Sequence, residues 1–414
     1  MANARLVILI VTYLLIAVQR VPFLRLNRPA AALLGAVAMV TIGGLPLRDA
    51  YAAIDLDVMV FLLGVLLITG YLELGGFFEW AARHVVVRAR SPRMLLATVV
   101  ATSGLLSAFF VNDTVCLVLT PLVIAAIRPL GLRPLPFLLA VALGANVGSA
   151  MTPTGNPQNM LIGVSSGIHF ARFVGTLALP SLGGLAIVYG VLAVIHRRDL
   201  SIGFVAAPAA QAPALPFDRP LVVKTLIIFA GALAGWLAGL SLPLVAISAA
   251  AVLLAIAQRD PAQAFAEVEW SLLLFFGALF VVMRGVRDLP LVASLTSVAG
   301  SQLHGALVHD AVVTSGAMLA LSNLVSNVPA VILWLPVVPH VAASAFVWLV
   351  MAMSSTFAGN LTLLGSMANL IVAERAEARG ERIGFGDYLR AGLPVTLLTL
   401  CWGIATIVLV WPPV

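Results

Sequence analysis

The chain has 414 residues, of which 62% are hydrophobic and 10% charged, and its mean hydropathy is +1.10. A water-soluble protein of this length needs far more polar surface, so these values exclude a soluble enzyme or binding domain. The net charge of +6 comes from basic residues that stand between apolar stretches, which indicates membrane orientation signals rather than a nucleic-acid patch. We therefore expect an integral plasma (inner) membrane protein that does not bind nucleic acid.

The apolar stretches predict ten full crossings, because about 20 apolar residues span the hydrocarbon core of a bilayer. The crossings are expected at residues 5–19, 29–46, 57–74, 135–164, 172–195, 220–239, 242–258, 270–286, 341–372 and 388–411. Two further stretches, 94–127 and 304–338, are too long for one crossing and have polar residues in their middles. We interpret both as re-entrant hairpins, since irregular backbone at membrane depth must be buried or line a cavity. The predicted fold is an all-α polytopic membrane protein.

The basic residues orient this layout. With both hairpins re-entrant, the main arginine groups, which include Arg28, Arg128 and Arg382, fall on one side, which the positive-inside rule assigns to the cytoplasm. Both termini then lie outside, as do Arg284, Arg287 and Arg48 beside Asp49, and the two halves are inverted relative to each other. We expect an N-terminal half at 1–195 (an extra first helix plus repeat 1), a cytoplasmic linker at 196–219, and repeat 2 at 220–414.

Two segments nearly repeat each other where the helices of two crossings, 135–164 and 341–372, are expected to break. Thr152–Asn159 and Thr362–Asn369 share the pattern T-x-x-G-x-x-x-N with an offset of 210 residues. Upstream, Asn112 and Asn327 each precede a proline by nine residues. Duplicated, Gly/Pro-broken membrane segments at matching places are typical of a secondary transporter whose site lies at the repeat interface.

Asp113 is the one charged residue between positions 94 and 127, and none occurs in 134–171 or 311–373. A carboxylate at membrane depth costs free energy and is therefore a functional candidate. Loss of hydration favours the neutral form of a carboxyl group, so we predict that Asp113 exchanges the coupling proton. The alternative is that Asp113 only caps the second helix of its hairpin.

The other candidate ligands are neutral hydroxyl and amide groups at the hairpin tips and helix breaks. With the free N–H groups of the helices that start there, they suit an oxyanion or a neutral polyhydroxy acid, and unwound carbonyls suit a small cation. For any single Thr or Ser, satisfying the broken backbone is an equal alternative. The predicted substrate- or ion-binding residues are Asn112, Asp113, Thr114, Thr152, Thr154, Asn156, Asn159, Ser326, Asn327, Asn360, Thr362, Ser366 and Asn369.

An enzyme is the weakest alternative. Gly163–Gly167 matches G-x-S-x-G, but that motif needs a strand–turn–helix setting and downstream Asp and His partners. The six histidines have no ligand spacing, and Cys116 and Cys401 both lie within apolar runs. We predict no catalytic residue, no metal site and no cofactor beyond a coupling ion, H⁺ or Na⁺.

Four segments resemble the ion transporter superfamily of arsenite permeases, sodium/proton antiporters and divalent-anion/sodium symporters. They are Phe110–Pro121, Ala145–Asn159, Ser322–Pro329 and Ala358–Asn369, and they are most similar to the arsenite-permease and plant silicon-efflux branch with its citrate-transporter-like domain. The resemblance implies a scaffold domain and a transport domain, often in a homodimer, with substrate held between hairpin tips and broken helices.

The hairpin tips differ from those of the symporter branch, in which both tips carry a Ser-Asn-Thr triplet. Here they read Asn112-Asp113-Thr114 and Ser326-Asn327-Val328, and the core segments contain no arginine. The missing hydroxyl, the added acid and the lack of arginine favour proton-coupled efflux of a small, weakly charged oxyacid such as arsenite or silicic acid. Sodium-coupled symport of a dicarboxylate or sulfate, and sodium/proton antiport, are the alternatives.

Overall fold

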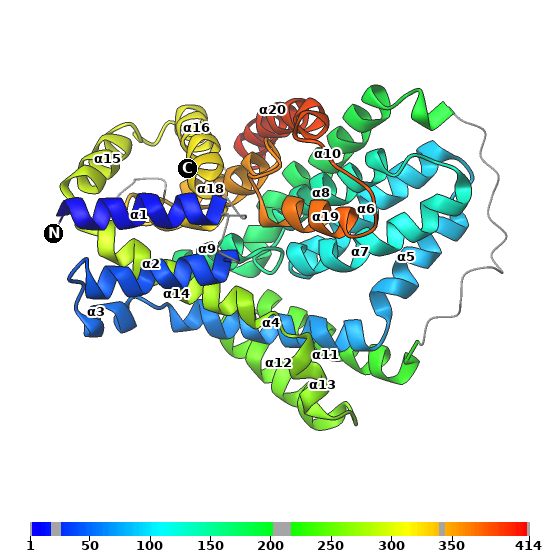
Figure 1. Cartoon of the computed structure of the whole chain (residues 1–414), viewed down its shortest axis with the longest axis horizontal. Coiled ribbons are helices and arrows are strands. Elements are labelled where there is room, and N and C mark those ends of the chain that lie inside the picture. Colours follow the sequence, from blue (N-terminus) through cyan, green and yellow to red (C-terminus); the bar gives the residue numbers. More distant parts are fainter. Residues whose placement is uncertain (1, 18–25, 202–216, 339–343, 412–414) are drawn as a thin grey trace.

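The computed structural model describes residues 2–17, 26–201, 217–338 and 344–411, and every regular element within them is helical (Figure 1). Eight of the described helices are long and apolar enough to cross a bilayer, and five more are apolar but shorter. The α-helices are α1 Ala2–Ala17, α2 Arg28–Thr41, α3 Leu47–Ala52, α4 Leu56–Leu74, α5 Phe77–Arg88, α6 Pro92–Phe109, α7 Asn112–Ile127, α8 Leu135–Ser149, α9 Pro157–Ser166, α10 Phe170–Ile195, α11 Arg219–Leu237, α12 Leu242–Ile256, α13 Pro261–Glu267, α14 Trp270–Arg287, α15 Pro290–Ser301, α16 Leu307–Val325, α17 Asn327–Trp334, α18 Ser344–Ala358, α19 Met367–Glu377 and α20 Phe385–Val410.

Both predicted helical hairpins and both predicted breaks are present, and the re-entry of the hairpins into the membrane stays a prediction. Hairpin 1 is α6 and α7, joined by Phe110 and Val111, and hairpin 2 is α16 and α17, joined at Ser326. Irregular segments at 150–156 and 359–366 separate α8 from α9 and α18 from α19. The middle of the predicted linker, 202–216, lies outside the described residues, as do 339–343 at the start of one predicted crossing.

Several helix contacts of the first half recur in the second half. Helix α1 packs against α2 and α14, and α11 packs against α12 and α4. Likewise α2 packs against α14, and α12 against α4. Helices α1 and α11 thus pack in the same way, each against the next helix of its own half and one helix of the other half.

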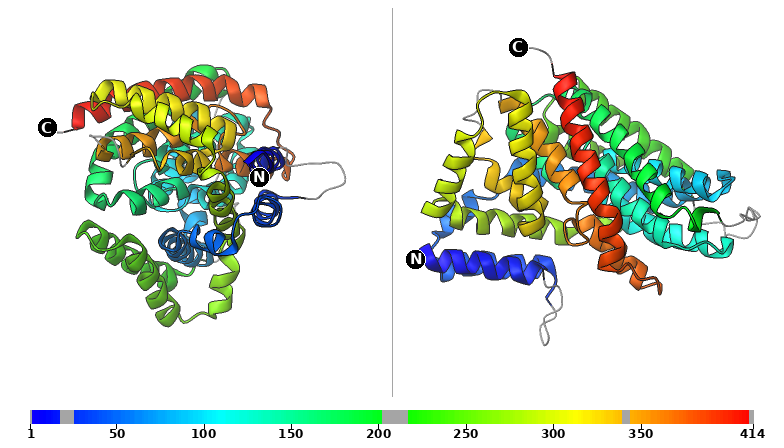
Figure 2. Two further views of the ribbon diagram at one scale, coloured as in Figure 1. Left: turned by 90° about the vertical axis from the view of Figure 1, so that its left-hand side faces the viewer. Right: turned by 90° about the horizontal axis from the view of Figure 1, so that it is seen from above.

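The helices form two groups. The framework group contains α1, α2, α4, α11, α12 and α14, whereas the hairpin group contains α6 to α10 and α16 to α20. Figure 1 shows α4, α11 and α12 along one edge of the molecule, and α10 and α20 at the opposite side. The two 26-residue helices α10 and α20 pack against each other, and Figure 2 shows α20 (red) running alongside α10 (green). The site described below lies where the two groups meet.

Ion pairs join loops that were assigned to the same side of the membrane. Arg128 lies 3.3 Å from Glu381, and both belong to the predicted cytoplasmic side. Arg284 lies 3.7 Å from Asp49, and both belong to the predicted outer side. Each contact joins two residues that the sequence assigned to one side of the membrane, and which side faces the cytoplasm stays a prediction.

Candidate functional site

The tip of hairpin 1 is bonded to the first helix break. The backbone N–H of Asn112 donates to the carbonyl of Gly155 at 2.9 Å. Only glycine fits at position 155, because a Cβ atom there would lie 2.2 Å from the carbonyl oxygen of Ser149. Helix α9 then begins with Asn156 as its N-cap, which accepts from the N–H of Asn159 at 2.9 Å, and with a proline in its first turn.

The last residue of each repeated motif satisfies the backbone of its break. The side-chain amide of Asn159 donates to the carbonyls of Ser149 and Thr152 at 3.2 and 3.1 Å. Asn369 donates to the carbonyls at the same two spacings, ten and seven residues before it, at 2.8 and 3.1 Å. The shared pattern T-x-x-G-x-x-x-N therefore encodes one local structure twice, in which an amide pairs the carbonyls that a broken helix leaves free.

Asn146 in α8 joins the two repeats at their centre. Its Oδ1 accepts from the amide of Asn112 and from the hydroxyl of Ser366, both at 3.0 Å. Its Nδ2 donates to the Oδ1 atoms of Asn360 and Asn369, at 2.9 and 2.8 Å. Asn146 is fully buried and was not among the predicted ligands, since a single amide in an apolar helix belongs to no repeated pattern.

A cavity of about 40 Å³ lies between the two hairpin tips. It has room for roughly three water molecules. Of the predicted ligands, Asn112, Asp113, Ser326, Asn327 and Ser366 line it. Its remaining lining comes from both helix groups: Ile16, Arg28, Pro157, Gln158, Leu272, Phe275, Phe276, Val328 and Met367. The two tips thus face one central cavity at the repeat interface, as inverted halves require.

Other predicted ligands lie beside the central cavity rather than on it. Thr152 and Thr154 both donate to the carbonyl of Ala108, the latter at 3.4 Å, and so hold hairpin 1 against the break. Thr362 donates to Asn323 at 3.2 Å. Of the predicted ligands, those outside the central-cavity lining are Thr114, Thr152, Thr154, Asn156, Asn159, Asn360, Thr362 and Asn369. Their role as ligands stays a prediction.

Arg28 reaches the central cavity, although the core segments that hold the predicted ligands contain no arginine. It is the first residue of α2, is only 9% exposed, and donates to the sulfur of Met367 at 2.9 Å. The sequence placed Arg28 in a cytoplasmic arginine group because spacing along the chain shows the side of the membrane and not the depth. Its neighbour Asn27 caps α2 through the N–H of Ala30, and this turn directs the helix start inward.

Asp113 does not cap its helix. The N-cap of α7 is Val111, two residues earlier, and Asp113 lies in the first turn at 4% exposure. Its carboxylate lines the central cavity and lies close enough to Arg28 and Glu269 to interact with both charges. The capping alternative therefore has no support in the structure.

Two larger cavities flank the central one. The inner cavity, about 370 Å³, shares Arg28 and Asp113 with the central cavity and is also lined by Glu269 and Glu374. Glu269 precedes the first turn of α14, and burial raises the pKa of its carboxyl.

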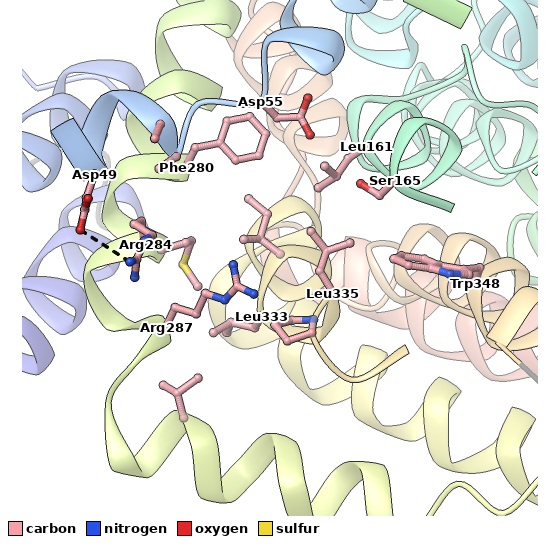
Figure 3. Close-up of a pocket in the computed structure, with 16 residues that line it drawn as sticks. Asp49, Asp55, Leu161, Ser165, Phe280, Arg284, Arg287, Leu333, Leu335 and Trp348 are labelled. Atoms are coloured by element: carbon pink, nitrogen blue, oxygen red, sulfur yellow. Dashed lines mark ion pairs between the residues drawn. The ribbon is translucent and has the colours of Figure 1, made fainter. Parts of the chain in front are cut away.

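The outer cavity, about 610 Å³, is lined by Asp49, Asp55, Arg284 and Arg287. In Figure 3, Arg284 turns toward Asp49, and Arg287 extends into the space beside Leu333. Single helix turns separate this cavity from the central one. In helix α9, Gln158 lines the central cavity and Leu161 lines the outer one. In helix α17, Val328 lines the central cavity and Ile332 lines the outer one.

The G-x-S-x-G segment forms no nucleophile elbow. Gly163–Gly167 is the last turn of α9 and its left-handed cap, where Gly167 has φ +63°, so no strand precedes the serine. Ser165 instead lines the outer cavity.

Comparisons with known proteins agree with this architecture. A family model described as "Citrate transporter" matches residues 13–358. The silicon efflux transporter LSI3 of rice, Oryza sativa subsp. japonica, is 34% identical over 96% of this chain and 96% of its own. The putative transporter arsB of Dictyostelium discoideum is 24% identical over 94% of this chain and 88% of its own. Among solved structures, MtrF of Neisseria gonorrhoeae, from a class of antimetabolite efflux pumps, has a TM-score of 0.58 at 14% identity and covers 98% of this chain and 94% of that one.

Proposed function

Because this chain belongs to the citrate transporter family and is an integral membrane transporter rather than an enzyme, we propose that it exports a small inorganic oxyacid, such as arsenite or silicic acid, in exchange for protons. The observation that carries this proposal is the central cavity, where one carboxylate meets amides and hydroxyls from both repeats.

The lining suits a compact, hydroxyl-rich substrate. Asn112 and Asn327 offer both donors and acceptors, and Ser326 and Ser366 offer hydroxyls. An oxyacid presents the same mixture of O–H donors and oxygen acceptors, so each hydrogen bond to water that it loses on entry can be replaced.

Asp113 provides the coupling in this proposal. An ionised carboxylate accepts hydrogen bonds from substrate hydroxyls at both oxygens and strengthens them with its charge, whereas a protonated one accepts only a weaker, uncharged bond. Proton and substrate then compete for Asp113, and by linkage each weakens the binding of the other. Competition of this kind lets an inward proton gradient drive the substrate outward.

The flanking cavities support alternating access. Each approaches the central cavity from one side, and about one turn of α9 and α17 closes the outer approach. Exchange requires that only one approach be open at a time, because a site open on both sides would dissipate the gradient.

Sodium coupling is the second candidate, and at the helix breaks sodium would have to share carbonyl oxygens that already accept hydrogen bonds. Sodium would bind unwound carbonyl oxygens. The carbonyls of Ser149, Ala150 and Thr152 already accept hydrogen bonds from Asn159, and Asn369 pairs with the second break in the same way.

Purified protein in liposomes tests the proposal. Arsenite, silicic acid, sulfate and a dicarboxylate are each offered under a pH gradient, a sodium gradient, or neither. We expect the pH gradient alone to drive arsenite or silicic acid. Transport that follows the sodium gradient and ignores the pH gradient would contradict the proposal.

A further inference from the structure

We propose that Arg28 is a specificity-determining residue of the transport site, and that Arg28 and Asp113 form a donor–acceptor pair that selects the uncharged form of an oxyacid. This inference rests on the proposed function and adds to it the charge state of the substrate.

The pair spans the boundary between the two helix groups. Arg28 comes from α2 of the framework group, and Asp113 comes from α7 of the hairpin group. Both side chains line the central cavity and also the inner cavity, so a substrate that passes from one to the other moves past both. Of the described residues around the central cavity, these two are the only charged ones.

No other charged side chain from the neighbouring described helices lines the central cavity, so this pair alone sets its charge. Glu269 faces Asp113, and Glu374 of α19 faces Arg28, but both glutamates line the inner cavity alone. Cys116, one turn along α7, is buried. Helix α8 contributes no acidic or basic residue, and none from the described parts of α5 or α6 lines either cavity.

Arg28 and Asp113 have opposite hydrogen-bonding capacities. A guanidinium has five N–H donors and no acceptor, and an ionised carboxylate only accepts. An oxyacid hydroxyl placed between them accepts from Arg28 through its oxygen and donates its hydrogen to Asp113. Sulfate or a dicarboxylate can accept from Arg28, but it has no hydrogen for Asp113.

Electrostatics point to the same substrate class. With Asp113 ionised, the pair carries no net charge, so an uncharged guest leaves the buried site neutral. An anion would add uncompensated charge beside the carboxylate, which is costly where water is largely excluded. The site therefore discriminates against sulfate even though it contains an arginine.

The test measures binding and its pH dependence for purified wild-type protein, Arg28→Gln and Arg28→Lys, with silicic acid and arsenous acid as probes. Arg28→Gln is expected to weaken binding at least tenfold. It should also move the pH at which binding is half lost to a higher value, because removing a nearby cation favours the protonated carboxyl. Arg28→Lys keeps the charge but not the planar fork, so it should keep the pH dependence and lose part of the affinity.

Arg172→Gln is the matched control, because Arg172 stacks on Trp411 at 4.6 Å and lines none of the three cavities. It should bind as the wild type does. If Arg28→Gln fails to fold, Arg28→Gln combined with Asp113→Asn removes both charges and leaves no unpaired one. The double variant should bind weakly and without pH dependence.

Two results distinguish a failure of the Arg28 assignment from a failure of the proposed function. If the wild type binds silicic or arsenous acid and Arg28→Gln binds it equally well with the same pH dependence, the assignment of Arg28 is wrong and the proposed function stands. If the wild type binds sulfate at pH 7 and neither uncharged acid, both are wrong.

Discussion

Replacing Asn146 with alanine should destabilise the protein far more than replacing its hydrogen-bond partner Ser366 with alanine. The side chain makes four hydrogen bonds, to Asn112, Ser366, Asn360 and Asn369. Two of these partners, Asn112 and Ser366, line the central cavity, where water can replace the lost bond. The other two are fully buried away from it and would be left with an unpaired oxygen.

The expected loss in the free energy of unfolding comes from the two unpaired oxygens of Asn360 and Asn369. A buried polar group without a partner costs about 1–3 kcal/mol, so Asn146→Ala should lose about 2–6 kcal/mol. Ser366→Ala removes one of the four bonds, and the loss should be about 1 kcal/mol. Asn146→Asp keeps the shape but turns the donor into an acceptor facing two oxygens, so it should destabilise the protein despite leaving no cavity.

Thermal unfolding of the purified wild type and variants in one detergent ranks their stabilities. We expect the wild type to be the most stable, then Ser366→Ala, with both Asn146 variants well below. An Asn146→Ala protein that unfolds at the wild-type temperature would refute the reasoning. An Asn146→Asp protein as stable as the wild type would show that volume, and not hydrogen bonding, matters at this position.

Three further predictions concern local structure. Gly155→Ala should cost about 1–3 kcal/mol, since a new Cβ meets a carbonyl oxygen 2.2 Å away, whereas Gly190→Ala, with nothing within 4 Å, should not lower the unfolding temperature. Ser326 has φ +72° and ψ 163°, a conformation that favours glycine, so Ser326→Gly should raise the unfolding temperature and Ser326→Ala should not. A hydrogen bond from Arg259 holds the pKa of Asp218 below its usual value, so this carboxylate stabilises the fold at neutral pH and ceases to do so as the pH falls below about 4. Asp218→Asn should therefore lower the unfolding temperature at pH 7 and make little difference at pH 3.

The breaks and tips were predictable because each puts polar residues, glycine or proline inside an apolar stretch. The pattern T-x-x-G-x-x-x-N occurs twice because one chemical need, pairing the carbonyls of a broken helix, arises twice. In a membrane segment that need has few solutions, so the sequence shows it directly.

Other features left no such signal. Arg28 lies next to an apolar stretch, like any orienting arginine, and only the inward start of α2 brings it to the central cavity. Asn146 is a lone amide whose partners lie 34 to 223 positions away along the chain. The similar packing of α1 against α2 and of α11 against α12 also left no signal, because packing partners cannot be read from residue spacing.

Proton movement measured together with substrate movement tests the central claim most directly. Liposomes holding wild-type protein and a pH-sensitive dye receive a gradient of silicic or arsenous acid, and the same is done with Asp113→Asn, which keeps the shape of the side chain but cannot titrate. We expect the substrate gradient to move protons in the opposite direction through the wild type. The Asn variant should move none, while it still binds substrate. If Asp113→Asn exchanges protons for substrate at the wild-type rate and with the same pH dependence, Asp113 does not couple transport and the account is wrong.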